Sequence, residues 1–177
     1  MNSAWRRAVF LDRDGVLNRV EWKNNICHSP RSLEDFQLLP GVADACSRLK
    51  AAGFLLLVAT NQPEIPRGFL DPAVLAAMHD RLRQWLPLDD IRMCLHDDTD
   101  TCACRKPAPG LLLDAARDWR IDLARSFMVG DREKDLVAGR RAGCRTILVG
   151  AQKVALPPDF SAPDLARAAD WILSRPV

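Results

Sequence analysis

Two aspartates separated by one residue follow a short apolar run near the start of the chain. Residues 8–18 read AVFLDRDGVLN, so that Asp12 and Asp14 come after Val9, Phe10 and Leu11 and before a glycine. Such a run suits a buried strand, and the glycine permits a turn that leaves both carboxylates at the sheet edge. Carboxylates this close repel each other unless a cation or a proton lies between them. The pattern indicates a metal or acid–base site, although a solvated aspartate-rich turn has the same local sequence.

Polar residues also end two later apolar runs. Thr60 and Asn61 follow residues 54–59, and Asp131 comes shortly after residues 127–129. If these runs are parallel strands, their carboxyl ends share one rim of a sheet, where catalytic groups are expected. Taken singly, each residue fits a turn or a helix N-cap. Their shared placement favours a site.

Lys106, in the segment Arg105-Lys106-Pro107, adds a cation between the apolar segments 91–95 and 127–129. It is one of five lysines in a chain with twenty arginines, so lysine is not the default surface cation here. A solvated side chain before proline is the ordinary alternative. Asp135 lies four residues after Asp131, on the same face of a predicted helix. It could orient a metal site or simply favour the start of the helix through its charge.

Length and composition describe an ordinary globular protein. The chain has 177 residues, 48% of them hydrophobic and 27% charged, with a formal net charge of +2. These values suit one domain over residues 1–177 and provide no general attraction to nucleic acid or membranes. No segment has the length of a membrane span or the character of a signal peptide. We therefore expect a cytoplasmic monomer whose partner is a small molecule.

Apolar runs alternate with helical periodicity along the whole chain. This alternation predicts an α/β fold of Rossmann-like type, with an open, mostly parallel five-stranded sheet and helices on both faces. Residues 16–39 form a long irregular stretch. The expected strands are 9–11, 54–59, 91–95, 127–129 and 146–149, and the expected helices are 40–53, 71–86, 107–119, 133–142 and 164–174.

Four potential soft or borderline metal ligands occur in the pattern C-x-H-x5-C-x-C. They are Cys94, His96, Cys102 and Cys104, in two short arms on either side of a polar loop. Alternate side chains of an extended arm face the same way, so the four can converge as a tetrahedral zinc site. A disulfide with a bystander histidine is the alternative, disfavoured in a cytoplasmic chain. Three thiolates on zinc would place negative charge beside Lys106 and help to fix its direction.

The remaining cysteines have simpler interpretations. Cys46 and Cys144 read as core residues. Cys27 and His28 in the irregular stretch could imitate a ligand pair but have no visible partners.

The segments DRDGVLN, TNQ, CRKP and VGDREKD resemble the four signature segments of the haloacid dehalogenase (HAD) superfamily of phosphohydrolases. The resemblance extends from residue 8 to about 149. It implies a magnesium-dependent phosphatase that forms an aspartyl-phosphate. By this resemblance Asp12 is the nucleophile, Asp14 the general acid and base, Thr60 with the Asn61 backbone the phosphoryl-holding segment, Lys106 the neutralising cation, and Asp131 the magnesium ligand beside Asp12 and the Asp14 carbonyl.

These roles agree with elementary chemistry. A phosphomonoester dianion repels a carboxylate, so Mg²⁺ and Lys106 must cancel charge before Asp12 can attack. Asp14 could then protonate the leaving alkoxide and later accept a proton from water. The neighbouring Asp12 charge is expected to raise the pKa of Asp14 toward that of a proton donor unless metal offsets it.

The zinc loop just before RKP resembles the branch that contains histidinol-phosphate phosphatases and D-glycero-D-manno-heptose 1,7-bisphosphate 7-phosphatases. That branch lacks a large cap domain, and the 45 residues between Asp14 and Thr60 leave no room for one. The segments CRKPAPGLLLDAARD and MVGDREKD, and Arg67-Gly68, look more like the heptose enzymes. Pro63-Glu64 and the segment 21–31 depart from them. The five-residue zinc spacer is closer to the histidinol-phosphate type.

Substrate choice must then depend on loops at the mouth of the site. The segment 16–31 and the arginines Arg67, Arg105 and Arg132 could bind a second anionic group, since guanidinium grips phosphate bidentately. Each arginine could equally be a solvated surface residue. A heptose bisphosphate is the expected substrate and histidinol phosphate the alternative. A zinc-stapled binding module without turnover is the alternative from another functional class.

Overall fold

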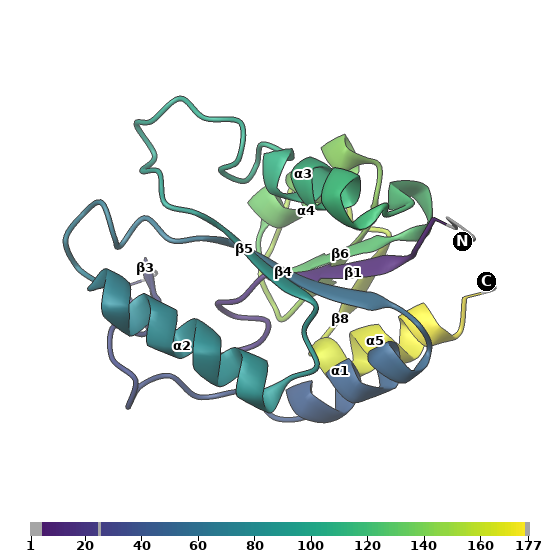
Figure 1. Ribbon diagram of the computed structural model, residues 1–177, viewed down its shortest axis with the longest axis horizontal. Helices are drawn as coiled ribbons and strands as arrows, with labels where there is room; N and C mark the ends of the chain where they lie inside the picture. The colour runs from purple at the N-terminus through teal and green to yellow at the C-terminus, as the bar shows by residue number, and fades with distance from the viewer. Residues whose placement is uncertain (1–4, 25, 176–177) are drawn as a thin grey trace.

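Six parallel strands form the central sheet of the protein (Figure 1). The computed structural model describes residues 5–24 and 26–175. The strands of this sheet are β1 (Ala8–Leu11), β4 (Leu55–Asn61), β5 (Asp90–Cys94), β6 (Phe127–Gly130), β7 (Arg145–Val149) and β8 (Phe160–Ala162). Their order across the sheet is β5-β4-β1-β6-β7-β8, and every neighbouring pair is parallel.

Helices cover both faces of the sheet, as the alternating pattern predicts. They are α1 (Val42–Ala51), α2 (Pro72–Trp85), α3 (Gly110–Trp119), α4 (Glu133–Ala142) and α5 (Leu165–Leu173), with a 3-10 turn, η1 (Leu123–Arg125). In β1, Val9 and Leu11 pack with α1, α2 and α5, whereas Ala8 and Phe10 pack on the face covered by α3 and α4 (Figure 1). Side chains of a strand alternate between the two faces, so one short run serves both cores. Among residues 5–24 and 26–175, no helix has both the length and the apolar character that crossing a membrane would require.

The order of the strands reverses at β1. The chain leaves β1 for β4 and β5 on one side, then returns to β6, β7 and β8 on the other. In open α/β sheets, ligands bind beyond the carboxyl ends of the strands at such a switch point. The residues that follow β1 and β6 and those that end β4 therefore share one rim.

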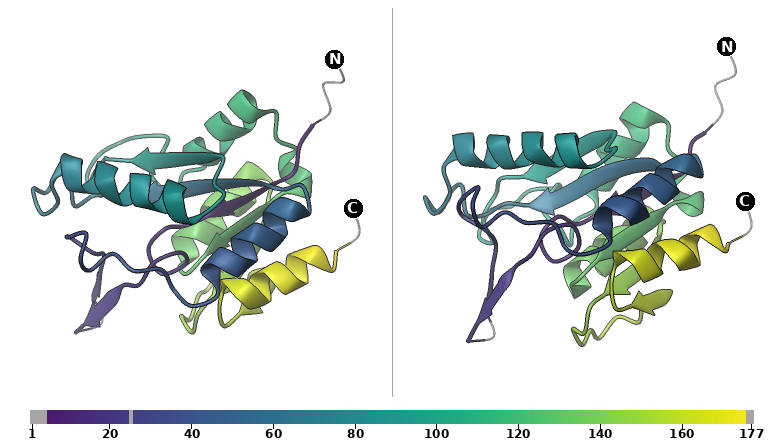
Figure 2. Two further views of the ribbon diagram at one scale, coloured as in Figure 1. Left: turned by 60° about the horizontal axis from the view of Figure 1, so that its bottom comes forward. Right: turned by 90° about the horizontal axis from the view of Figure 1, so that it is seen from below.

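The stretch 16–39, which the sequence indicates as irregular, contains a short antiparallel hairpin. Its strands are β2 (Glu21–Lys23) and β3 (Ile26–His28). The hairpin stands away from the central sheet, at the end opposite the chain termini (Figure 2). Each strand has only three residues and β2 is wholly exposed, so no apolar alternation marks it. With α1 and the start of β4, it makes up the regular structure described between Asp14 and Thr60, which agrees with the absence of a large cap.

Two further differences concern sheet size and a helix start. The expected sheet has five strands, but β8 adds a sixth beside β7. Three residues after a Pro-Pro break were too short a signal for a strand. Helix α3 begins at Gly110 rather than Pro107. Ala108 precedes Pro109, and the ring of a proline disfavours helical backbone angles in the residue before it, so the helix starts after Pro109.

Candidate active site

The rim at the carboxyl ends of β1, β4 and β6 brings five of the predicted site residues together. Asp12 follows β1, Thr60 and Asn61 end β4, and Asp131 follows β6. Lys106 comes from the loop between β5 and α3, and its ammonium lies 2.7 Å from Asp12 Oδ1. All five side chains are buried. The proximity expected from the strand ends is present in the fold.

Lys106 lies between two carboxylates. Its Nζ is 2.7 Å from Asp12 Oδ1 and 2.6 Å from Asp135 Oδ1. Burial opposes the charge of this ammonium, but Asp12 and Asp135 outweigh burial and raise the pKa of Lys106 above its usual value. Asn61 fixes the backbone at this point, since Lys106 N donates to Asn61 Oδ1 at 3.0 Å and Asn61 Nδ2 donates to Lys106 O at 2.9 Å. The cation is thus held charged and aimed at Asp12.

Three buried carboxylates, Asp12, Asp131 and Asp135, converge so that one oxygen of each lies within 4.8 Å of the others. Burial raises the pKa of Asp12. Burial, with the charge of Asp12, raises the pKa of Asp131 to about 7. Asp131 Oδ1 is buried and has no hydrogen-bond partner among the described groups. A concentrated oxygen donor set with an unpartnered oxygen fits a hard divalent cation such as Mg²⁺.

Gly15 lets the turn after β1 pass close to Asp131. Its φ is +91°, and a Cβ built on it would collide with the Asp131 carboxylate. Any other residue would combine backbone strain with displacement of that carboxylate. The glycine that indicates a turn in the sequence is therefore also required for the Asp131 carboxylate to occupy its place in the cluster.

The carboxylate of Asp14 is held by nitrogen donors outside this cluster. Arg13 Nη2 donates to both of its oxygens at 2.9 Å, Asn18 Nδ2 donates at 2.9 Å, and Gln62 Nε2 donates at 3.0 Å. Burial opposes ionisation, but Arg13 and these hydrogen bonds lower the pKa of Asp14 below its usual value. The expected upward shift of this pKa is therefore wrong for this conformation, because the arginine outweighs the neighbouring Asp12.

Arg13 itself is wholly buried, although an arginine between two aspartates suggests a solvated side chain. His79 Nε2 lies 3.4 Å from Arg13 Nη1, and the ring of Phe36 lies 5.6 Å from the guanidinium carbon. Gln62 extends the network, since its Nε2 also donates to Thr60 Oγ1 at 2.8 Å. The only hint in the sequence was an arginine between two aspartates at the end of a buried strand. That hint does not say which carboxylate the arginine pairs with.

A hollow of about 240 Å³ opens above Asp12 and Asp14. The structure brings Arg67, Arg105 and Arg132, which the sequence analysis proposed for substrate binding, to its wall. The other lining residues come from the hairpin and the residue after it, from the loop that begins with Thr60-Asn61-Gln62, from the loop between the two cysteine arms (residues 97–101, the zinc-type loop), and from the start of α4. They are Cys27, Ser29, Asn61, Pro63, Glu64, Asp98 and Lys134.

The arginines at this wall are engaged by protein groups. Arg67 pairs with Asp97 and Asp98, and Arg105 also pairs with Asp98. Asp97 and Asp98 belong to the loop between the two cysteine arms. These pairs place both guanidinium groups at the mouth while offsetting much of their charge.

Arg132 connects the hairpin to the rim. Its Nη2 lies 2.7 Å from Cys27 Sγ, its guanidinium carbon lies 5.9 Å from the Trp22 ring, and its Nε is 3.5 Å from Asp131 Oδ2. Burial raises the pKa of the Cys27 thiol, so this thiol remains protonated near neutral pH. Cys27 thus contacts an arginine, and among the described residues it belongs to neither group that could hold a metal ion.

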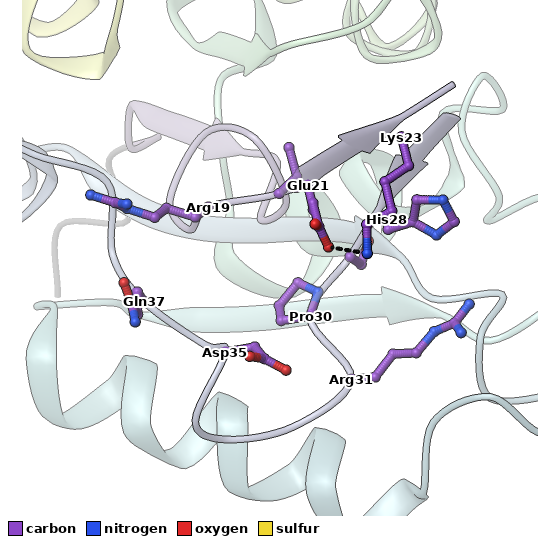
Figure 3. Close-up of a pocket in the computed structure, with 10 residues that line it drawn as sticks. Arg19, Glu21, Lys23, His28, Pro30, Arg31, Asp35 and Gln37 are labelled. Atoms are coloured by element: carbon purple, nitrogen blue, oxygen red, sulfur yellow. Dashed lines mark ion pairs between the residues drawn. The ribbon is translucent and has the colours of Figure 1, made fainter. Parts of the chain in front are cut away.

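Half of the residues of the segment 16–31 line a second hollow of about 530 Å³ (Figure 3). Cys27 and Ser29 are the residues of this segment that line the hollow above Asp12, and Ser29 lines both spaces. The second hollow is open and of mixed charge. Its labelled residues are Arg19, Glu21, Lys23, His28, Pro30, Arg31, Asp35 and Gln37 (Figure 3).

Cys94, His96, Cys102 and Cys104 converge as expected from their spacing. The Sγ–Sγ distances are 3.1 Å for Cys94–Cys104, 3.6 Å for Cys102–Cys104 and 3.8 Å for Cys94–Cys102. His96 Nδ1 is 3.3 Å from both Cys94 Sγ and Cys104 Sγ. Zn–S bonds of about 2.3 Å in a tetrahedron require ligand separations of roughly 3.8 Å, so the donors are close to the geometry of a closed zinc site. All four are available to a metal because the cysteines are not in disulfides.

The cysteine cluster is directly connected to the residue before Lys106. Arg105 N donates to Cys102 Sγ at 3.3 Å, and Arg105 Nη1 donates to His96 O at 2.9 Å. The positions of Cys102 and His96 therefore help to fix the backbone next to Lys106. Cys46 and Cys144 are buried in the two cores, as expected.

Comparison with known proteins places this geometry in a family. A family model described as HAD-hydrolase-like matches residues 103–168. A D-glycero-D-manno-heptose-1,7-bisphosphate 7-phosphatase of Thermosynechococcus vestitus is 39% identical over 193 residues, covering 94% of this chain and 95% of that protein. A D-glycero-beta-D-manno-heptose-1,7-bisphosphate 7-phosphatase of Bordetella bronchiseptica is 40% identical over 148 residues, covering 81% and 80%.

Solved structures agree with these relatives. The D,D-heptose 1,7-bisphosphate phosphatase of B. bronchiseptica, crystallised with magnesium and phosphate, has a TM-score of 0.81 at 37% identity, over 94% of this chain and 98% of that one. The corresponding phosphatase of Burkholderia thailandensis has a TM-score of 0.70 at 31% identity, over 96% and 100%. The chain therefore belongs to the haloacid dehalogenase superfamily, in the branch of the heptose bisphosphate phosphatases.

Proposed function

We propose that this protein hydrolyses D-glycero-D-manno-heptose 1,7-bisphosphate at the 7-phosphate, through transient phosphorylation of Asp12. The observation that carries the reaction class is the placement of Lys106 between Asp12 and Asp135 at the sheet's switch point. A carboxylate can attack a phosphate dianion only where fixed positive charge lies beside both. The names of the relatives support the choice of substrate.

Asp12 supplies the nucleophilic oxygen. One carboxylate oxygen forms a bond to phosphorus while the bond from phosphorus to the sugar oxygen breaks, leaving an acyl phosphate on Asp12 and an alkoxide. Lys106 neutralises phosphoryl charge, and the Thr60 hydroxyl and Asn61 backbone hold the phosphoryl oxygens. Bound through Asp12, Asp131 and the Asp14 carbonyl, Mg²⁺ would offset the remaining negative charge.

Asp14 moves the protons. Its ionised form, held by Arg13, Asn18 and Gln62, is ready to accept a proton from the water that attacks the acyl phosphate. To protonate the alkoxide in the first step, the same carboxyl must carry a proton. Protonation removes the negative charge that these donors stabilise, so their hydrogen bonds to the protonated carboxyl are weaker.

We assign Zn²⁺ to Cys94, His96, Cys102 and Cys104 as a structural ion. Four protein ligands leave no open position for substrate or water, which is the character of a structural zinc site. The contacts of Arg105 with Cys102 and His96 would carry the order of this site to Lys106.

Replacement of Asp12 by asparagine tests the mechanism. Asp12→Asn should lower kcat by more than about 100-fold with the fold retained, because an amide cannot form the acyl phosphate. The exposed Asp80→Asn is the matched control and should keep wild-type activity. A loss of less than about 100-fold in Asp12→Asn would be too mild for a missing nucleophile.

The substrate is tested separately with the wild-type protein. We expect kcat/KM for the heptose bisphosphate to exceed that for histidinol phosphate by at least about 30-fold, since the relatives that are 39–40% identical are named for the heptose bisphosphate. A preference for histidinol phosphate would overturn the substrate assignment and leave the reaction class intact. No turnover of any phosphate ester would overturn both.

A further inference from the structure

Four cationic side chains line the hollow above Asp12, and they differ in how far protein carboxylates offset them. Arg67 and Arg105 pair with aspartates of the zinc-type loop, and Arg132 lies 3.5 Å from Asp131. Lys134 is the fourth, and it has no hydrogen bond or ion pair within the described parts of the chain. It is half-buried, near the start of α4.

Lys134 lines the same hollow as the Asp12 carboxylate that would attack phosphorus. The negative charge of Asp12 favours the ammonium form of Lys134. Burial lowers the pKa of Lys134. A partly desolvated ammonium without a partner gains more from a bound anion than a solvated surface lysine does.

The charges around Asp12 leave a role for such a cation. The carboxylates Asp12, Asp131 and Asp135 face the single ammonium of Lys106, so one divalent cation brings this group to neutrality. Arg13 already offsets Asp14. A phosphoryl group that enters as a dianion then needs two further positive charges. Among the described residues that line the hollow, Arg132 and Lys134 are the cations that do not pair with Asp97 or Asp98.

We propose that Lys134 is a catalytic residue that contacts the non-bridging oxygens of the phosphoryl group being transferred, acting as a second cation opposite Lys106. This role rests on the proposed phosphatase function. It differs from a role in reading the substrate's second anionic group, because it applies equally to phosphate esters that have no such group. The position of Lys134 at the start of α4 adds the positive end of a helix dipole in the same direction.

Steady-state kinetics of Lys134→Met on a simple aryl phosphate, at saturating Mg²⁺, test the proposal. We expect kcat/KM to fall about 30-fold or more, and the inhibition constant of inorganic phosphate to rise about 10-fold or more. Lys134→Arg should recover most of both. Lys50→Met is the matched control: it removes the same charge at the other end of the sheet, where Lys50 pairs with Asp89 at 2.6 Å, and should leave both constants unchanged. Circular dichroism of each variant shows whether the fold is retained.

Three outcomes would overturn the proposal. The first is an aryl phosphate constant within about 3-fold of wild type in Lys134→Met. The second is a loss confined to the bisphosphate, which would make Lys134 a reader of the second anion. The third is a loss of phosphate binding that Lys134→Arg does not restore. A wild-type protein that binds phosphate but hydrolyses no ester would instead overturn the proposed function. Because an inhibition constant cannot then be measured, calorimetry of phosphate binding to the wild-type protein and to Lys134→Met would test the contact.

Discussion

Removal of both partners of the Arg13–Asp14 pair should destabilise the protein by less than the sum of the two single removals. The Arg13 side chain is wholly buried and that of Asp14 is 7% exposed, so solvent does little to screen an unpaired charge here. Breaking a buried ion pair by removing one partner typically costs about 3–5 kcal/mol, because the remaining charge loses its counter-ion. We expect Arg13→Met and Asp14→Asn each to lower the free energy of unfolding by about 3 kcal/mol or more.

The double variant decides whether an unpaired charge is the cause. With both charges removed, its loss should be smaller than the sum of the single losses by at least about 2 kcal/mol. Urea unfolding followed by circular dichroism gives the four free energies of this cycle. The exposed pair Asp80–Arg83, 3.1 Å apart, provides a control cycle with the same substitutions and should show a coupling of about 0.5 kcal/mol or less. Equal couplings in the two cycles would refute the argument from burial.

Two other predictions concern the pH dependence of stability and the zinc content of the protein. Burial and Arg13 lower the pKa of His79 to about 4, below the unfolded value of about 6.5, so the unfolded state binds more protons between these values and stability falls as pH decreases. The buried histidine should therefore lower the free energy of unfolding by about 2 kcal/mol at pH 5 relative to pH 8. Urea unfolding of His79→Gln should show a change between these pH values that is smaller by that amount. The same change in both proteins would contradict this. Elemental analysis of protein washed free of Mg²⁺ should find about one zinc per chain, and Cys104→Ser should lower both Tm and kcat. Absence of zinc together with pairwise-oxidised thiols would favour a disulfide instead.

The features that the sequence predicted correctly depend on local patterns. Continuous apolar runs and the polar or turn residues after them placed the strands and their carboxyl ends, and the parallel topology then required Asp12, Thr60 and Asp131 to share a rim. The cysteine cluster followed from ligand spacing within ten residues. Hairpin β2–β3 and strand β8 were missed because strands of three residues are too short to carry a clear apolar pattern: β2 is wholly exposed, and Ala162 is the one buried residue of β8.

The electrostatics of the site could not be predicted in the same way, because it depends on contacts between distant segments. Asp14 lies two residues after Asp12 in the sequence, which suggests a raised pKa, yet the buried Arg13, with hydrogen bonds from Asn18 and from Gln62, 48 residues away, turns the shift downward. Arg67 counts as a free cation in the sequence, yet a loop 30 residues further on supplies its counter-ion. Lys134 became distinct only when its neighbours proved to be paired. Where charge is concentrated, what a residue can bind depends on which partners the fold has already given it. The same reasoning makes Lys134, rather than Arg67 or Arg105, the cation most available to an incoming phosphoryl group.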